Sequence, residues 1–202
     1  MKLLQKRWLL PAAGLLIGLI IIAVLFIWLK PHTFGGTLLQ SPQAAYDFSL
    51  KGPENKEVRL SDYQGKVVLL FFGFTYCPDV CPTTMANLRK VIDLLGTDGK
   101  QVQVVLITVD PARDTPERLK SYAEQFNPTF IGLTGEPDEI METASAYGVS
   151  FEILPNMDPH MYFMSHTSTV MLIDPEGKLR VVYPYGVDKQ ILTDDIRYIL
   201  SH

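Results

Sequence analysis

Hydrophobic and polar residues follow one another along this chain in blocks that predict a strand-helix-strand unit. Residues 67–74 are apolar, β-branched and aromatic, as in a buried strand of ordinary length. A helix is then predicted from apolar residues at helical spacing that end before a glycine, namely Met85, Leu88, Val91, Ile92 and Leu95. Residues 102–109 form a second apolar block. A helix that joins two buried strands implies that these strands pair in parallel.

The same pattern predicts the rest of a compact domain. The remaining elements are, in chain order, a hairpin over 46–60, a helix from Pro116, a strand at 129–133, a helix over 136–147, a hairpin over 169–183 and a helix over 188–200. Residues 149–164 show no period, and we expect them to be irregular. This order of elements, with both cysteines after the first parallel strand, predicts an α/β domain with a thioredoxin-like fold.

The chain begins with an apolar stretch that is long enough to cross a bilayer. No residue from Trp8 to Leu29 is charged, and about 20 apolar residues suffice for a membrane-spanning helix. Three basic residues precede the stretch and favour a cytoplasmic N-terminus. We therefore expect residues 1–30 to be an uncleaved, single-pass anchor in the inner membrane, with the rest in the periplasm or an equivalent oxidising space. A cleaved signal peptide is the alternative, but its apolar core is usually shorter.

Composition narrows what the part outside the membrane can do. Residues 31–44 contain prolines and glycines without a period and are predicted to be a tether, which leaves 45–202 as the folded domain. The net charge of -4 and the absence of a basic cluster beyond the anchor argue against binding to nucleic acid. Only two cysteines are present, so the domain is not a secreted disulfide scaffold.

Both cysteines stand where the first buried strand gives way to a helix. Pro82 is tolerated only in the first turn of a helix, so the helix should begin close to Cys81. A thiol at a helix N-terminus has a lowered pKa, which favours the thiolate. The spacing of four places Cys77 and Cys81 on one side of a helical turn, where they can chelate one ion or form a disulfide. On chemistry alone, a metal-binding pair of cysteines and a redox-active pair are equally supported. A structural, unreactive disulfide is less well supported than either.

Two thiolates leave a metal site incomplete, so a further ligand is needed. His32 lies in the predicted tether and His202 is the last residue, which leaves His160 and His166. Thioether ligands for Cu(I) are also present nearby, although methionines more often fill a core, at Met157, Met161 and Met164.

Several charged residues should gather at the carboxyl edge of the predicted parallel strands, where sites of α/β proteins form. Asp79 lies between the cysteines, and Asp110, Arg113 and Asp114 follow the second strand. For Arg113 and Asp114 we expect solvated loop positions rather than a part in the site.

Three segments, in this order, resemble the Sco/SenC copper-binding proteins. They are Phe74-Thr75-Tyr76-Cys77-Pro78-Asp79-Val80-Cys81-Pro82, Thr108-Val109-Asp110-Pro111-Ala112-Arg113-Asp114-Thr115-Pro116, and His166 followed by Met171-Leu172-Ile173-Asp174-Pro175-Glu176-Gly177. The resemblance covers about residues 45–200. It implies a thioredoxin fold that binds a copper ion through Cys77, Cys81 and His166 and helps to assemble the dinuclear copper centre of cytochrome c oxidase. Members of the family often have an aspartate just before the histidine, where this chain has Ser165.

The function predicted from this resemblance is that of a membrane-tethered copper metallochaperone, a binding protein rather than an enzyme. Its expected partner is the copper-binding subunit of cytochrome c oxidase or another copper carrier. The alternative is a thiol-disulfide oxidoreductase that keeps the copper-ligand cysteines of that subunit reduced. That activity needs a redox-active disulfide between Cys77 and Cys81 but not His166. A peroxiredoxin-like peroxidase is a weaker third alternative, because nothing in the sequence singles out one activated cysteine.

Overall fold

The computed structural model describes residues 18–19, 22, 32–154 and 162–202. The chain divides into two compact units, Met1–Thr33 and Phe34–His202. No helix among the described residues is long and apolar enough to span a membrane. The anchor predicted over residues 1–30 lies outside the described residues except at positions 18, 19 and 22.

A six-stranded sheet forms the centre of the second unit. Its strands, in spatial order, are β1 (Thr37–Leu38), β10 (Leu179–Tyr183), β9 (Val170–Ile173), β4 (Val67–Gly73), β5 (Val102–Thr108) and β6 (Ile131–Leu133). The strands β4, β5 and β6 are parallel, as the strand-helix-strand pattern predicts, whereas β9 and β10 form an antiparallel hairpin beside β4. Every residue of β4 and β5 is buried, which explains their uninterrupted apolar sequences.

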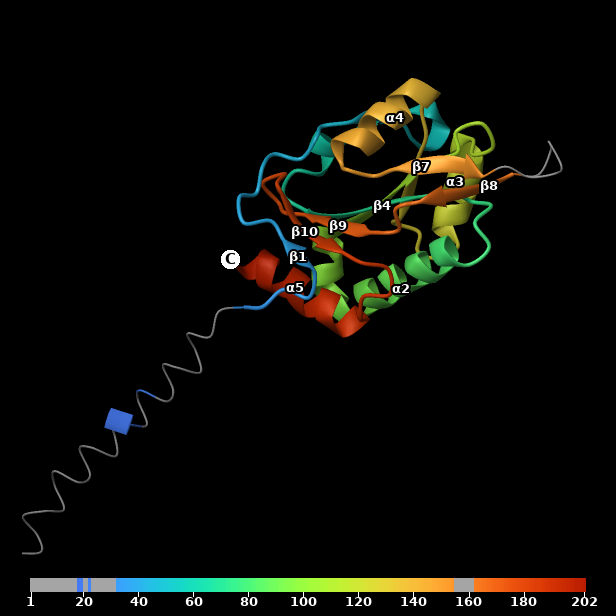
Figure 1. The fold of residues 1–202 in the computed structure, drawn as a ribbon. Helices are drawn as coiled ribbons and strands as arrows, with labels where there is room; N and C mark the ends of the chain where they lie inside the picture. Colours follow the sequence, from blue (N-terminus) through green and yellow to red (C-terminus); the bar gives the residue numbers. More distant parts are fainter. Residues whose placement is uncertain (1–17, 20–21, 23–31, 155–161) are drawn as a thin grey trace, which may run out of the picture. The chain divides into compact units, whose positions relative to one another are not determined.

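Helices cover the two faces of this sheet (Figure 1). They are α2 (Val80–Leu95), α3 (Pro116–Glu124), α4 (Pro137–Ala146) and α5 (Lys189–Ser201). Figure 1 shows α2 and α5 together on one side of the sheet and α4 on the other. The Thr115 side chain caps α3 by accepting a hydrogen bond from the amide of Arg118, with Pro116 at the first helical position. The four helices and the sheet together give the predicted α/β fold.

Two small hairpins lie outside the central sheet. The first joins β2 (Ser49–Lys51) to β3 (Glu57–Arg59), as predicted, and the second joins β7 (Phe151–Leu154) to β8 (Phe163–His166). The expectation that residues 149–164 are irregular is wrong for the described part of that segment. Three of the four residues of β7 are exposed, so the strand carries no alternation of buried and solvated positions that the sequence could reveal.

The segment predicted to be a tether is also partly folded. Within residues 31–44, β1 pairs with β10 at one edge of the sheet, and the Leu39 amide extends this pairing with a 2.9 Å hydrogen bond to the Arg180 carbonyl. A side chain at Gly36 would come within 2.7 Å of the Val182 carbonyl, so this close approach requires glycine. A two-residue strand shows no period, which is why the sequence pattern missed it.

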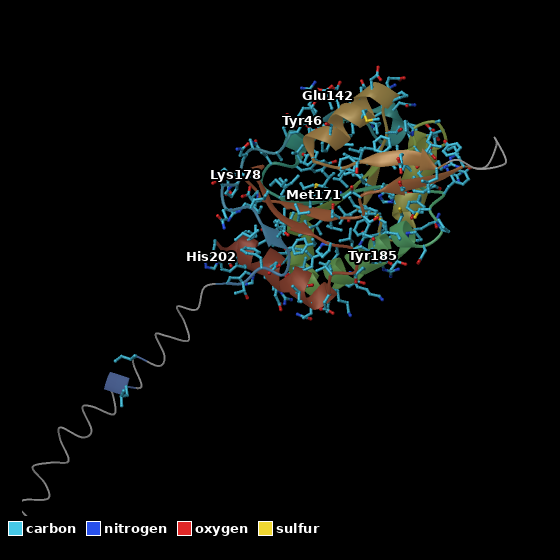
Figure 2. All side chains as sticks on the ribbon, in the orientation of Figure 1. Tyr46, Glu142, Met171, Lys178, Tyr185 and His202 are labelled. Carbon is cyan, nitrogen blue, oxygen red and sulfur yellow. The ribbon has the colours of Figure 1, made fainter. Side chains whose placement is uncertain are left out.

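The chain after β1 is fixed to α4. The Tyr46 hydroxyl donates a 2.9 Å hydrogen bond to the Glu142 carboxylate, and Figure 2 shows the two residues side by side. The Tyr147 hydroxyl donates to the Tyr46 carbonyl at 2.7 Å. These bonds join the start of the domain to the helix that covers the second face of the sheet.

Candidate metal centre

The two cysteines lie at the carboxyl end of β4, where a tight turn leads into α2. The Cys77 amide donates a 3.3 Å hydrogen bond to the Phe74 carbonyl, and α2 begins one residue before Cys81. The helix therefore begins where Pro82 predicts. Cys77 itself precedes the helix, so the expectation that both cysteines share one helical turn is corrected. The amide of Cys81, a free donor of the first helical turn, donates to the Cys77 Sγ at 3.3 Å.

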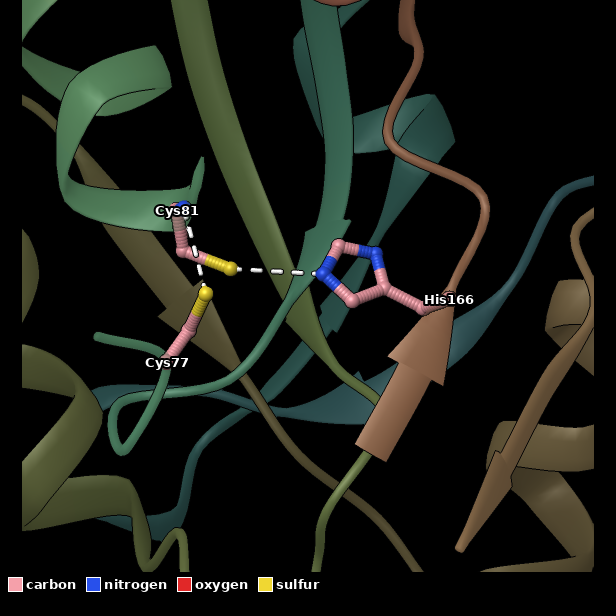
Figure 3. Close-up of side chains that lie close together, drawn as sticks. All are labelled: Cys77, Cys81 and His166. Atoms are coloured by element: carbon pink, nitrogen blue, oxygen red, sulfur yellow. Dashed lines mark hydrogen bonds between the residues drawn. The ribbon is translucent and has the colours of Figure 1, made fainter. Parts of the chain in front are cut away.

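His166 completes a compact group of three side chains (Figure 3). It is the last residue of β8, and its Nε2 lies 3.4 Å from the Cys81 Sγ. Its Nδ1 lies 3.2 Å from the Thr167 carbonyl oxygen, which can only accept a hydrogen bond. When Nδ1 donates in that bond and the ring is neutral, Nε2 carries the lone pair and faces the sulfurs. The rings of Phe74 and Phe71 flank the imidazole edge-on, with centroids 5.7 and 6.1 Å away.

The ligand atoms of Cys77, Cys81 and His166 all lie within 4.8 Å of one another. Bonds from a metal ion to thiolate and imidazole are about 2.0–2.3 Å long, so ligands of one ion stand roughly 3.5–4.5 Å apart. The site therefore fits one ion with only small side-chain movements. Two sulfurs and one imidazole suit a soft or borderline ion such as Cu(I) or zinc. Among the described residues, no other cluster of three histidine, cysteine or acidic residues has a metal-binding arrangement.

The two thiols are not equivalent. Cys77 is partly exposed, whereas Cys81 is fully buried, and both are free thiols. A hydrogen bond from the Cys81 thiol lowers the pKa of Cys77 to about 5, and the backbone amides of Cys81 and Asp79 act in the same direction. The same bond, together with burial, raises the pKa of Cys81. The metal-free site is therefore a thiolate beside a neutral thiol, and a metal ion must displace that remaining proton.

The sequence interpretation missed Asp114, which is completely buried rather than solvated. Its carboxylate accepts hydrogen bonds from the Thr75 amide and hydroxyl, at 2.9 and 2.6 Å, and from the Thr108 hydroxyl at 2.7 Å. It thereby joins the end of β5 to the turn that carries Cys77. A carboxylate that follows a buried parallel strand and stands one residue before a helix cap was the available signal. The expectation of a solvated Arg113 is also wrong, because its guanidinium pairs with the buried Asp110.

The other sequence candidates have different positions. Met164 is partly buried and packs against the core, which agrees with a packing role. Ser165 is exposed on β8, and its hydroxyl donates to the Glu152 carboxylate of β7 at 3.4 Å. Glu152 is its cross-strand partner, so a carboxylate stands beside Ser165 although the chain lacks the aspartate common in the family. Met157, His160 and Met161 lie outside the described residues.

Comparison with known proteins identifies the family. The SCO1/SenC family model matches residues 37–201, most of the chain. The chain belongs to the SCO1/SenC family. Protein sco1 of Schizosaccharomyces pombe is 39% identical over 145 residues, which are 70% of this chain and 55% of that protein. The chain thus spans little more than half the length of that relative.

Solved structures of SCO1/SenC members have the same fold. Apo Sco1 from Thermus thermophilus is 41% identical, with a TM-score of 0.77 over 85% of this chain and 99% of that one. ScoI from Bradyrhizobium japonicum with copper bound is 34% identical, with a TM-score of 0.72 over 78% of this chain and 100% of that one. The more distant BsSco is 25% identical, with a TM-score of 0.61 over 81% of this chain and 98% of that one. It is described as a member of the Sco family of cytochrome c oxidase assembly proteins with a disulfide switch. These likenesses confirm the predicted thioredoxin-like α/β fold of the domain.

Proposed function

We propose that this protein is a copper metallochaperone that binds one copper ion through Cys77 Sγ, Cys81 Sγ and His166 Nε2. The observation that carries the proposal is the convergence of these three atoms within 4.8 Å, on segments 85 residues apart in the chain. The structure of a related ScoI with copper bound supports the choice of copper over zinc. We propose that the ion is delivered to the dinuclear copper centre of cytochrome c oxidase, because BsSco belongs to a family of oxidase assembly proteins.

Exposure of the site agrees with transfer of the ion to a partner. Cys77 and His166 are partly accessible, so a partner ligand can approach the ion from solvent, whereas Cys81 is fully buried. An ion held from one side and open on the other can exchange ligands one at a time. The partner is then the copper-binding subunit of the oxidase or another copper carrier.

A second function is favoured by the state of the two thiols. Cys77 is an accessible thiolate with a buried thiol next to it, as in a thiol-disulfide oxidoreductase. Its thiolate would attack a partner disulfide and release one partner thiolate. Cys81, after losing its proton, would attack the mixed disulfide and release the second partner thiolate. The partner gains two electrons and this protein becomes a disulfide, which an external dithiol must reduce before the next cycle.

Replacement of His166 separates the two functions, because only copper binding uses the imidazole. His166→Ala keeps both thiols, so we expect thiol exchange to persist while copper affinity falls by about tenfold or more. Metal analysis of the purified protein should give one copper per chain, and Cys77→Ser/Cys81→Ser should give none. Oxidase assembly at limiting copper is the deciding measurement, with circular dichroism to establish that the variant is folded. Normal assembly with folded His166→Ala would reject the chaperone and favour the oxidoreductase.

We also propose the location inferred from the uncharged stretch between Trp8 and Leu29. Residues 1–30 would anchor the protein in the inner membrane, with the copper-binding domain in the periplasm or an equivalent oxidising space. A reporter that is active only in the cytoplasm, fused after His202, should remain inactive. An active fusion would contradict this orientation.

A further inference from the structure

Four side chains beside Cys77 form a stack of alternating aromatic and cationic groups, which we call the Arg–Tyr stack. It consists of Arg118, Tyr76, Arg113 and Tyr162. The guanidinium carbon of Arg113 lies 3.7 Å from the centroid of the Tyr162 ring and 4.8 Å from that of Tyr76. The guanidinium carbon of Arg118 lies 4.1 Å from the centroid of the Tyr76 ring. Such contacts are attractive at distances up to about 6 Å, and Arg is well suited to them because its guanidinium is planar.

Hydrogen bonds fix Tyr162 more firmly than the ring contacts alone would. Its hydroxyl donates to one oxygen of the Asp110 carboxylate at 2.6 Å, and the Nε of Arg113 donates to the other. The Nη1 of Arg113 also donates to the Tyr162 carbonyl oxygen at 3.2 Å. Asp110 is only 3% exposed, so its buried carboxylate offers both side chains a fixed hydrogen-bond acceptor. Arg113 thus contacts both the ring and the backbone of Tyr162.

The position of Tyr162 gives these contacts their importance. It directly precedes β8, the strand that ends at His166. Among the described residues, β7 and β8 form a separate two-stranded sheet that does not pair with the central sheet, which positions the cysteines. Next to His166, the Thr167 amide donates a hydrogen bond to the Ser150 carbonyl. Ser150 directly precedes β7, so this bond lies within the hairpin and does not attach it to the central sheet. The short connection from His166 to β9 fixes only the end of β8, whereas the contacts of Arg113 with Tyr162 hold its start.

We propose that Arg113 is a positioning residue for the third ligand, which acts through Tyr162 and β8 to hold the His166 imidazole against the two sulfurs. This inference rests on the proposed function. It adds that the rate at which copper leaves is set partly by a residue that does not touch the ion. Residues that orient metal ligands typically change metal affinity by about 10–100-fold when they are replaced.

Arg113→Met tests the proposal, because methionine keeps an unbranched apolar side chain but removes the guanidinium. We expect one copper per chain, release of copper to a competing chelator that is about tenfold faster, and a weaker nitrogen hyperfine signal from His166 in the Cu(II) form. The matched control is Arg180→Met. Arg180 is also partly buried and pairs with a buried carboxylate, that of Asp174, at 3.0 Å in the β9–β10 hairpin. It should lower stability without changing either copper measurement.

A double substitution tests whether Arg113 affects copper release only through His166. If Arg113 acts through His166, Arg113→Met should add nothing to copper release when it is combined with His166→Ala. Tyr162→Leu removes the ring that the Arg113 guanidinium contacts while Arg113 itself stays in place, so it decides the matter if Arg113→Met does not fold.

The outcomes distinguish this inference from the proposed function. If the unsubstituted protein binds no copper, the proposed function fails and this inference fails with it. If it binds copper, but Arg113→Met, or Tyr162→Leu in its place, releases copper at the original rate with an unchanged spectrum, only the role of Arg113 is rejected. An equal effect of Arg113→Met with and without His166 would also reject it, because the residue would then act on the sulfurs.

Discussion

The chemistry of the site depends on a difference between two sulfur atoms four residues apart. Cys81 belongs to the first turn of α2 and is fully buried, whereas Cys77 lies before the helix and is partly exposed. The buried thiol and the amides of the turn all donate toward the exposed sulfur. One sulfur is thus held as a nucleophilic thiolate, and the other keeps its proton until a metal ion or a disulfide replaces it.

This difference predicts the pH dependence of Cys77 alkylation in the metal-free protein. The pKa of Cys77 is lowered to about 5, so the thiolate predominates above that pH and is lost as the pH falls through it. Labelling by iodoacetamide, followed by mass spectrometry, should be nearly constant from about pH 6 to 8 and fall below about pH 5. In Cys81→Ala the midpoint should move to higher pH, because the thiol donor is gone. A rate that still climbs above pH 8, like that of an ordinary cysteine with a pKa of about 8.5, would contradict the assignment.

Gly73, at the end of β4, controls the space around Cys81. A Cβ atom there would lie 3.0 Å from the Cys81 Sγ and 2.8 Å from the ring of Phe71. We expect Gly73→Ala to destabilise the fold by about 1–3 kcal/mol and to weaken copper binding, because the Phe71 ring and the Cys81 sulfur must shift to make room. Denaturant unfolding and copper titration measure the two effects.

The control for this substitution is Gly177→Ala in the β9–β10 turn. Gly177 has a φ of 78° and no atom near its added Cβ, so alanine costs stability through backbone strain alone. It should leave copper binding unchanged. Weaker copper binding in both variants would show that general stability, rather than crowding of Cys81, is responsible.

At the scale of elements, the sequence pattern predicted the strands and helices whose burial produces a recognisable run or stripe of apolar residues. The strands β4 and β5 are covered by helices, so they appear as continuous apolar runs, and the helices show their buried stripes. The strands β1 and β7 are short or mostly exposed, and no pattern marks them. The cysteine pair was recognisable from spacing, whereas the ligand role of His166 was implied only by the resemblance. The sequence could indicate only the position of Asp114 after a buried strand and before a helix cap, because its burial depends on contacts with Thr75 and Thr108.

Copper should join two elements that are otherwise paired separately. None of the described side chains of β7 and β8 is fully buried, and in the described part of the chain this hairpin has no strand pairing with the central sheet. Its amides should therefore exchange with solvent faster than those of β5 in the metal-free protein. A copper ion that binds Nε2 of His166 ties β8 to the start of α2. At a free copper concentration about 100 times the dissociation constant, this should slow exchange in β8 by up to roughly 100-fold.

Hydrogen-exchange mass spectrometry with and without copper measures this effect. His166→Ala is the control, because copper held by the two sulfurs alone should leave β8 unprotected. Equal protection of β8 in that variant would mean that the ion acts on the hairpin by another route.

At the scale of the whole molecule, the domain begins earlier than composition suggested. Phe34 packs edge-on against Tyr198 of α5, with ring centroids 5.6 Å apart, and the Gly35 amide donates to the buried Asp195 carboxylate at 3.0 Å. With β1, these contacts place residues 34–44 within the second compact unit. A boundary at residue 45 would therefore cut through the folded domain.

Two truncated proteins test this boundary. A protein of residues 45–202 lacks β1, which exposes the edge strand β10 and removes a donor from Asp195, so we expect it to be about 2 kcal/mol or more less stable than a protein of residues 34–202. Both should bind one copper ion, because every ligand lies between residues 77 and 166. Gly36→Ala in the longer protein should reproduce part of the loss, since its Cβ would meet the Val182 carbonyl at 2.7 Å. Identical unfolding midpoints in urea for the two truncated proteins would show that residues 34–44 do not stabilise the domain and act only as a tether.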